Sequence, residues 1–232
     1  MEKEKIKERY VCEFCNKPFA KEKTLMVHVC ENKRRHFSKN EKHVQLGLMA
    51  FQKFYETMQP SIKKQSFNDF ANSPYYNAFV KFGSFLVNSN PLYPERYINW
   101  VIRSGTKLDL WHKDSLYERY LDELLKIEPA DTAIQRTVKT MIEWADINGA
   151  AWEHYFKYVN LNRAVHHITN GLISAWIILN CESGKAMLTN MSDDQLDIIE
   201  PFIDPKFWKR RFKENPADVA LVNELITISK VP

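Results

Sequence analysis

The chain has 232 residues and a formal net charge of +4, with 44% hydrophobic and 13% aromatic residues. This composition excludes a disordered chain and predicts a folded protein with a sizeable core. The charged start Met-Glu-Lys-Glu-Lys argues against a secretory signal, and no apolar run approaches the roughly 20 residues that cross a bilayer. We therefore expect a soluble, intracellular protein without disulfides or membrane contact.

A short segment near the N-terminus carries the most specific pattern. Cys12 and Cys15 are separated by two residues, and His28 follows after twelve more. Two thiols at this spacing can present both sulfurs to one Zn²⁺, and a helix can return an imidazole as third ligand. Phe19 and Leu25 stand where so small a unit needs its apolar core. The sequence therefore predicts a zinc site with at least three ligands.

These residues resemble the C2H2 zinc-finger family over about residues 10–30, which implies a small ββα fold. The positions where the family's second histidine usually falls hold residues that do not suit zinc, namely Asn32, Lys33 and Arg34. Cys30 follows His28 by two residues and can join the site only if the helix ends there. His36 is the alternative and requires the chain to loop back. We favour Cys30, because thiolate is the better zinc ligand and Glu31-Asn32 is a plausible helix end.

Positive charge is concentrated around this predicted finger. Residues 1–43 hold twelve Lys or Arg against seven Glu, a net of +5, whereas the rest of the chain totals about −1. Such an asymmetry is typical of a phosphate-binding extension. A solvated tail that only keeps the protein soluble is the alternative.

If the finger reads DNA as members of the family do, Lys21, Thr24 and Val27 face the bases. Lys21 could donate to guanine, Thr24 is permissive, and Val27 could only touch a thymine methyl. One finger covers about three base pairs, so we expect weakly sequence-specific binding. The predicted nucleic-acid-binding residues are Lys21, Lys23, Thr24, Lys33, Arg34 and Arg35.

The remainder of the chain shows helical periodicity. The predicted helical segments are 44–58, 75–86, 94–102, 108–127, 129–144, 152–158 and 164–179, followed in 187–231 by short helices separated by Pro201, Pro205 and Pro216. Long alternation of apolar and polar residues is lacking, and only six glycines are available for hairpins. The predicted fold class is all-α, a multi-helix domain preceded by a small ββα-type zinc finger.

The predicted organisation has four parts. These are a charged N-terminal tail over 1–9, a zinc finger with basic flank over 10–37, a connecting helix and linker over 38–64, and a helical domain over 65–232.

A second basic strip, with aromatic residues interleaved, lies near the C-terminus. Its cations are Lys206, Lys209, Arg210, Arg211 and Lys213, and its aromatic residues are Phe202, Phe207, Trp208 and Phe212. Such a pattern can stack bases and hold phosphates. At helical spacing the aromatic residues are more often core and the cations a solvated face, which is the interpretation adopted for the sequence.

Catalysis is not predicted. His166 and His167 resemble the first histidine pair of HNH endonucleases, but no histidine follows position 167 to supply the later ligand. Gly-rich phosphate loops, Ser-centred elbows and paired-carboxylate signatures are absent from the sequence.

Along its whole length the chain resembles single-finger proteins of large T4-like tailed phages that carry no assigned activity. The resemblance rests on the finger, on the run from Ser73 to Phe82 and on the Leu108-Asp-Leu-Trp111 segment. It implies a protein of the bacterial host cytoplasm that acts in phage transcription, replication or genome handling. The sequence thus favours a zinc-containing nucleic-acid-binding protein, and the alternative is a structural finger that docks phage or host proteins.

Overall fold

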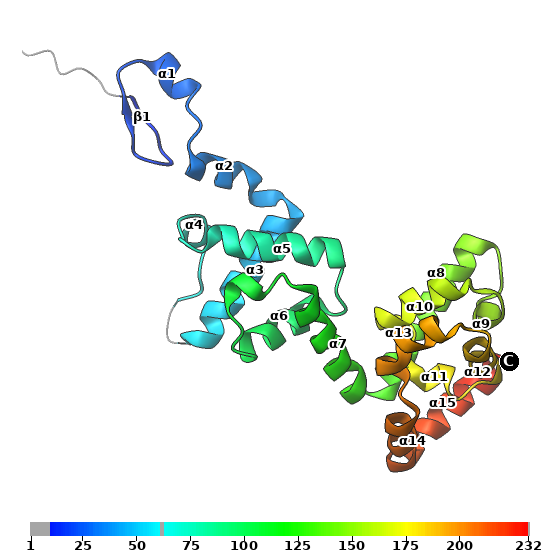
Figure 1. The fold of residues 1–232 in the computed structure, drawn as a ribbon. Coiled ribbons are helices and arrows are strands. Elements are labelled where there is room, and N and C mark those ends of the chain that lie inside the picture. The colour runs from blue at the N-terminus through cyan, green and yellow to red at the C-terminus, as the bar shows by residue number, and fades with distance from the viewer. Residues whose placement is uncertain (1–9, 61–62, 232) are drawn as a thin grey trace, which may run out of the picture. The chain divides into compact units, whose positions relative to one another are not determined.

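The protein is described here from a computed structural model, which describes residues 10–60 and 63–231. The predicted tail, 1–9, lies outside these residues. The fold class is confirmed, because a small two-stranded hairpin with a short helix is followed by an all-α body (Figure 1). In the part of the chain that is described, no helix has the length and apolar character needed to cross a membrane.

The chain divides into two compact units, Met1–Leu116 and Tyr117–Pro232, which we call the first and second units. This division into two units does not test the four parts predicted from the sequence, which therefore stay a prediction. The elements of the first unit are β1 Tyr10–Val11, β2 Pro18–Phe19, α1 Glu22–Met26, α2 Glu31–Phe37, η1 Ser38–Asn40, α3 Lys42–Met58, α4 Phe67–Ala71, α5 Tyr76–Ser89, α6 Pro94–Arg103 and η2 Leu108–Leu110. Helix α7, Asp114–Ile127, contains the boundary.

The first unit is built on the contact between α3 and α5, which cross each other (Figure 1). Two buried glycines, Gly47 in α3 and Gly83 in α5, allow the backbones to meet. A Cβ added to Gly83 would lie 1.9 Å from the carbonyl oxygen of His43. Buried aromatic rings fill the space around this crossing, namely Phe51, Phe70, Phe79, Phe82 and Trp111.

The structure differs from the predicted helices at two places in this unit. The short helix α4 was not predicted, although Ser66 and Asp69 form the capping box that starts it. The predicted helix 108–127 is instead a 3₁₀ turn followed by α7. The chain bends there because Trp111 is buried, and its indole nitrogen donates to the Thr106 carbonyl at 2.8 Å.

The second unit is a set of helices around one apolar core. Its elements are α8 Ala130–Asn148, η3 Trp152–His154, α9 Tyr155–Tyr158, α10 Leu161–Thr169, α11 Ala175–Ile178, α12 Glu182–Thr189, α13 Asp193–Ile203, α14 Pro205–Glu214 and α15 Pro216–Ile228. Trp176 and Trp208 meet edge to face near its centre, with ring centroids 5.5 Å apart. The predicted aromatic cluster near the C-terminus therefore belongs to the core.

Two predictions about helix ends in this unit are wrong. The predicted helix 164–179 stops at Thr169, because Gly171 takes the left-handed conformation with φ of 69° before α11 begins. Pro201 lies inside α13 and does not separate helices. Pro205 and Pro216 stand in the first turns of α14 and α15, where a missing N–H costs nothing.

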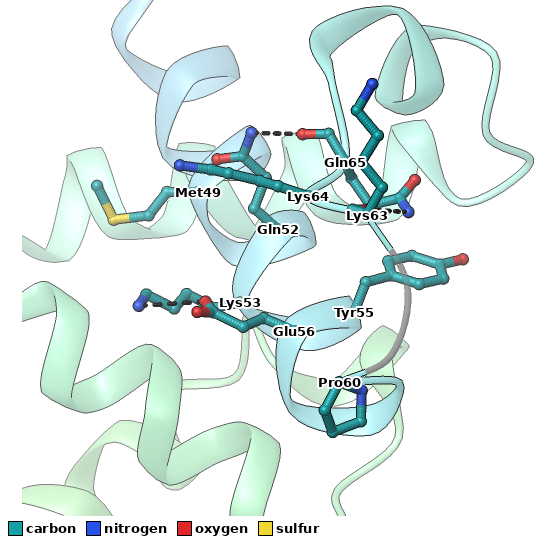
Figure 2. Close-up of a pocket in the computed structure, with 9 residues that line it drawn as sticks. All are labelled: Met49, Gln52, Lys53, Tyr55, Glu56, Pro60, Lys63, Lys64 and Gln65. Atoms are coloured by element: carbon teal, nitrogen blue, oxygen red, sulfur yellow. Dashed lines mark hydrogen bonds and ion pairs between the residues drawn. The ribbon is translucent and has the colours of Figure 1, made fainter.

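A surface pocket of about 340 Å³ lies beside the C-terminal half of α3 (Figure 2). Two of its polar side chains have partners within the pocket lining. Gln52 donates to the Gln65 carbonyl at 2.7 Å, and Lys53 pairs with Glu56 at 3.4 Å. None of the residues predicted to bind metal or nucleic acid lines this pocket.

Candidate metal centre

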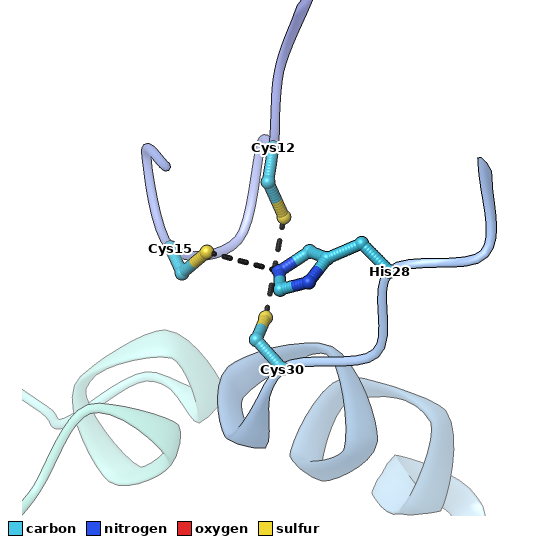
Figure 3. A group of neighbouring side chains, drawn as sticks. All are labelled: Cys12, Cys15, His28 and Cys30. Carbon is cyan, nitrogen blue, oxygen red and sulfur yellow. Dashed lines mark hydrogen bonds between the residues drawn. The ribbon is translucent and has the colours of Figure 1, made fainter. Parts of the chain in front are cut away.

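Four side chains of the hairpin region converge on one point (Figure 3). The donor atoms of Cys12, Cys15, His28 and Cys30 all lie within 4.8 Å of one another. The sulfurs of Cys12 and Cys30 are 4.0 Å apart, and Cys15 Sγ lies 3.3 Å from His28 Nε2. All the cysteines are free thiols. The four side chains are therefore close enough together to hold a metal ion.

The first two ligands come from a tight turn between β1 and β2, which pair antiparallel with Tyr10 opposite Phe19. The N–H of Cys12 donates to the Lys17 carbonyl at 3.0 Å, and the N–H of Asn16 donates to the Cys12 carbonyl at 2.8 Å. Asn16 takes the left-handed conformation with φ of 56°, which asparagine tolerates better than most residues. This turn brings both thiols to the same side of the hairpin.

The other two ligands lie on the connection between α1 and α2. Helix α1 ends at Met26, so His28 and Cys30 follow it in non-helical backbone. Cys30 is extended, with φ of −94° and ψ of 167°, and its sulfur accepts from the Lys33 N–H at 3.4 Å as the N-cap of α2. The prediction that a helix carries His28 and ends at Glu31-Asn32 is therefore wrong, because α1 ends before His28 and these two residues begin α2. The earlier end of α1 is what lets Cys30 join the site.

Backbone hydrogen bonds favour the ionised form of one ligand. Burial raises the pKa of the Cys12 thiol, but hydrogen bonds from the backbone of Phe14 and Cys15 and from the Cys15 and Cys30 thiols together hold that pKa below its ordinary value. A hydrogen bond from the Lys17 backbone lowers the pKa of the neighbouring Cys15 thiol, but burial and the other two thiols raise it above its ordinary value. Thiolate is the form that binds metal.

The alternative fourth ligand, His36, lies elsewhere. It stands in α2, and its ring centroid is 5.1 Å from that of Phe14 and 5.4 Å from that of Phe67. The structure therefore gathers Cys30, and not His36, with the other three candidates.

The expected small apolar core is present but slight. Phe19 and Leu25 are half-buried, and the Phe19 ring packs on His28 with centroids 4.7 Å apart. Among residues 10–37 only Cys12 is buried. Apolar burial therefore contributes little to holding this segment together.

The residues predicted to bind nucleic acid fall into two groups. Lys21, Lys23, Thr24 and Arg34 are exposed, whereas Lys33 and Arg35 are half-buried. Val27, the third position expected to face bases, is the exposed C-cap of α1. Because α1 has only five residues, its exposed face is about 8 Å long.

Arg35 anchors α2 to the helical part of the first unit. Its side chain is 16% exposed, pairs with Glu31 at 3.2 Å, donates to the Ala71 carbonyl at 2.7 Å and lies over the Tyr76 ring. Lys33 Nζ donates to the His28 carbonyl at 3.3 Å. Arg35 is thus committed to contacts within the protein.

Asn32 also joins the finger to the helical part of the first unit. The sequence indicates only that this residue is unsuited to zinc. Its amide donates to the Phe14 carbonyl at 2.9 Å and to the side-chain oxygen of Asn72 at 3.3 Å. It thereby links the cysteine turn to α2 and to the end of α4. No spacing rule in the sequence identifies such a contact, because Asn72 is forty residues away.

No protein-family model, curated protein or solved structure matches this chain. What the site can do is therefore argued from its own geometry. The conclusion is a cluster of three thiols and one imidazole, carried by a ββα unit, with the separation and chemistry of a metal centre.

Proposed function

We propose that Cys12, Cys15, His28 and Cys30 bind one Zn²⁺ and that the resulting finger binds nucleic acid. Three sulfurs and one nitrogen are a donor set that structural zinc sites use. Zinc–ligand bonds of about 2.0 to 2.3 Å in a tetrahedron place sulfurs about 3.8 Å apart, and sulfur about 3.5 Å from nitrogen. The observed separations of 4.0 and 3.3 Å come close to both. The ion would tie the hairpin to the connection between α1 and α2.

The nucleic-acid proposal is supported by the free cations next to this centre. Lys21, Lys23 and Arg34 are exposed, and none of them forms an ion pair with another described residue. Phosphates attract such side chains, and each contact releases counterions. Sequence-independent binding is favoured, because the short α1 offers few groups to base edges.

The whole-chain resemblance supports the setting proposed for this activity. We place the protein in the cytoplasm of a bacterial host, as an accessory factor in phage transcription, replication or genome handling.

A second candidate function is favoured by a different observation. Met26 and Val27 at the end of α1 are 72% and 77% exposed, and Val29 follows at 54%. Exposed apolar side chains on a small unit are typical of protein docking sites. In this alternative the finger contacts a phage or host protein and binds no nucleic acid.

A salt titration of nucleic-acid binding distinguishes the two functions. The zinc-loaded chain is titrated with a duplex DNA, a single-stranded DNA and an RNA of mixed sequence from 50 to 300 mM salt. The variant Lys21→Glu, Lys23→Glu, Arg34→Glu should bind each probe more weakly, and its salt slope should fall by roughly three units, about 0.9 per lost duplex contact. Arg35 is left unchanged because its loss would disturb packing.

The matched control reverses three exposed lysines of the second unit, Lys139, Lys157 and Lys185. It changes net charge equally and should retain the slope of the parent. Absence of binding at 50 mM salt, or an unchanged slope in the finger variant, would overturn the nucleic-acid proposal. Replacing Met26 and Val27 with serine should leave the salt slope unchanged.

A further inference from the structure

Helix α14 places four cations on one exposed face. Lys206, Lys209, Arg210 and Lys213 are all exposed, and at 100° per residue they fall within an arc of about 100°. We call these four side chains the α14 basic face.

The fifth cation of the predicted strip, Arg211, points the other way. Its guanidinium donates to the backbone carbonyls of Lys126 and Glu128 and lies 5.4 Å above the Trp176 ring. Trp208, also on this inner side, is buried. Arg211 therefore packs against the core, whereas the other four cations of the strip make no contact with it. The composition of the strip alone does not reveal this difference.

The α14 basic face has no acidic partner. Within the described residues, none of its four side chains forms an ion pair, and only Arg210 has a ring contact, at 6.0 Å from the Phe207 centroid. The preceding helix α13 exposes four acids instead, Asp193, Asp194, Asp197 and Glu200. Helix α13 thus exposes acids without a basic side chain, whereas the exposed charges of α14 are these four cations and Glu214 at its C-terminal end.

We propose that the α14 basic face binds the phosphate backbone of nucleic acid. Lys206 and Lys213 are seven residues apart, so four charges span about 10 Å of helix, or one per about 3.5 Å. One strand of duplex DNA carries one charge per about 3.4 Å of axis. The proposal rests on the proposed function only for the class of partner, because the finger and the α14 basic face belong to different units.

Charge alone does not separate nucleic acid from a membrane or an acidic protein, but apolar surface does. The large apolar side chains of α14, Phe207, Trp208 and Phe212, are buried or half-buried. A helix that lies on a bilayer needs an apolar face to insert, and stable protein interfaces need an apolar centre. A face of cations without either suits a partner that is recognised through its phosphates.

The test neutralises the face in the full, zinc-loaded chain. The variant Lys206→Gln, Lys209→Gln, Arg210→Gln, Lys213→Gln is titrated with a mixed-sequence duplex DNA over 50 to 300 mM salt. We expect weaker binding and a salt slope lower by about three to four units, because four phosphate contacts are lost. Thermal unfolding should match the parent, since the core contacts of Arg211 and Trp208 are retained.

The control replaces four other exposed cations of the second unit with glutamine, Lys139, Lys157, Arg163 and Lys185, and should keep the parental slope. An α14 variant that binds DNA with the parental slope overturns this proposal and leaves the finger function standing. If instead only the finger variant keeps the parental slope, the finger function fails and the α14 proposal stands. A chain that binds neither DNA nor RNA at 50 mM salt overturns both, as does a chain that binds only anionic vesicles or a second copy of itself.

Discussion

The finger segment, residues 10–37, and the helical part of the first unit are held together by different means. In the finger only Cys12 is buried, and four candidate metal ligands stand where a core would be. The segment around α3 and α5 instead buries rings such as Phe51, Phe79 and Phe82. The comparison teaches that neighbouring parts of one chain can depend on different interactions. With the proposed zinc bound, we expect the finger to be sensitive to chelators and the helical part to changes in packing.

Metal removal should produce the largest difference between them. Structural zinc contributes about 10 to 16 kcal/mol to the folding of small finger peptides at pH 7, far more than the slight core here can replace. After treatment with a chelator, amides in residues 10–37 should exchange rapidly with deuterium, while those of α3 and α5 stay protected. Equal loss of protection in both segments would contradict independent stabilisation.

Single ligand variants sharpen the same comparison. Cys30→Ser should lower zinc retention at least tenfold more than His36→Ala, because Cys30 lies in the cluster and His36 packs on Phe14 and Phe67. Zinc content after competition with a coloured chelator measures this directly. The reverse ranking would identify His36 as the fourth ligand.

A larger side chain where α3 and α5 cross should destabilise the helical part of the first unit and leave the finger unaffected. Gly83→Ala places a methyl 1.9 Å from the His43 carbonyl oxygen, so we expect a loss of about 3 kcal/mol in the free energy of unfolding. Gly105→Ala is the control, because that glycine has open space around it and only a positive φ of 67°, which costs about 1 kcal/mol. Urea unfolding of both variants gives the ranking, and zinc retention should be unaffected in either. Equal losses would show that α3 and α5 do not approach so closely.

A smaller effect is expected from pH in the second unit. His167 is buried and hydrogen bonded to the Tyr155 hydroxyl at 2.7 Å, and burial, followed by the charges of Arg163 and His166, lowers its pKa to about 4. As pH falls below 6.5 the unfolded chain binds a proton that the folded chain refuses. Stability should therefore fall by roughly 1 to 3 kcal/mol between pH 6.5 and 4 and level off below.

Urea unfolding at pH 7 and pH 4.5 measures this loss. His167→Gln should reduce the difference between the two pH values, whereas His166→Gln at the neighbouring exposed position should retain it. An unchanged difference in His167→Gln would assign the pH dependence to other groups.

Much of the fold could be predicted where local signals were strong. The segment 44–58 became α3 because apolar residues recur at helical spacing until Pro60, and Gly149 ends α8 in the left-handed conformation. Some errors were local signals that were passed over, such as the capping box of Ser66 and Asp69 and the left-handed Gly171. At Trp111 a tertiary contact decided the conformation, because its burial shortened the predicted helix 108–127.

By itself, the sequence determined the helical class and three candidate metal ligands, because periodicity and ligand spacing are local properties of a chain. The ββα unit came from the zinc-finger resemblance, and the sequence favoured Cys30 over His36 without excluding His36. Only the tertiary structure decided which cations remain available to a partner. Arg34 and Arg35 are neighbours in the chain, as are Arg210 and Arg211, yet in each pair the first is exposed and the second is packed against backbone carbonyls and aromatic rings. Adjacent positions on a helix are separated by about 100°, so which of them faces solvent depends on where the rest of the protein lies.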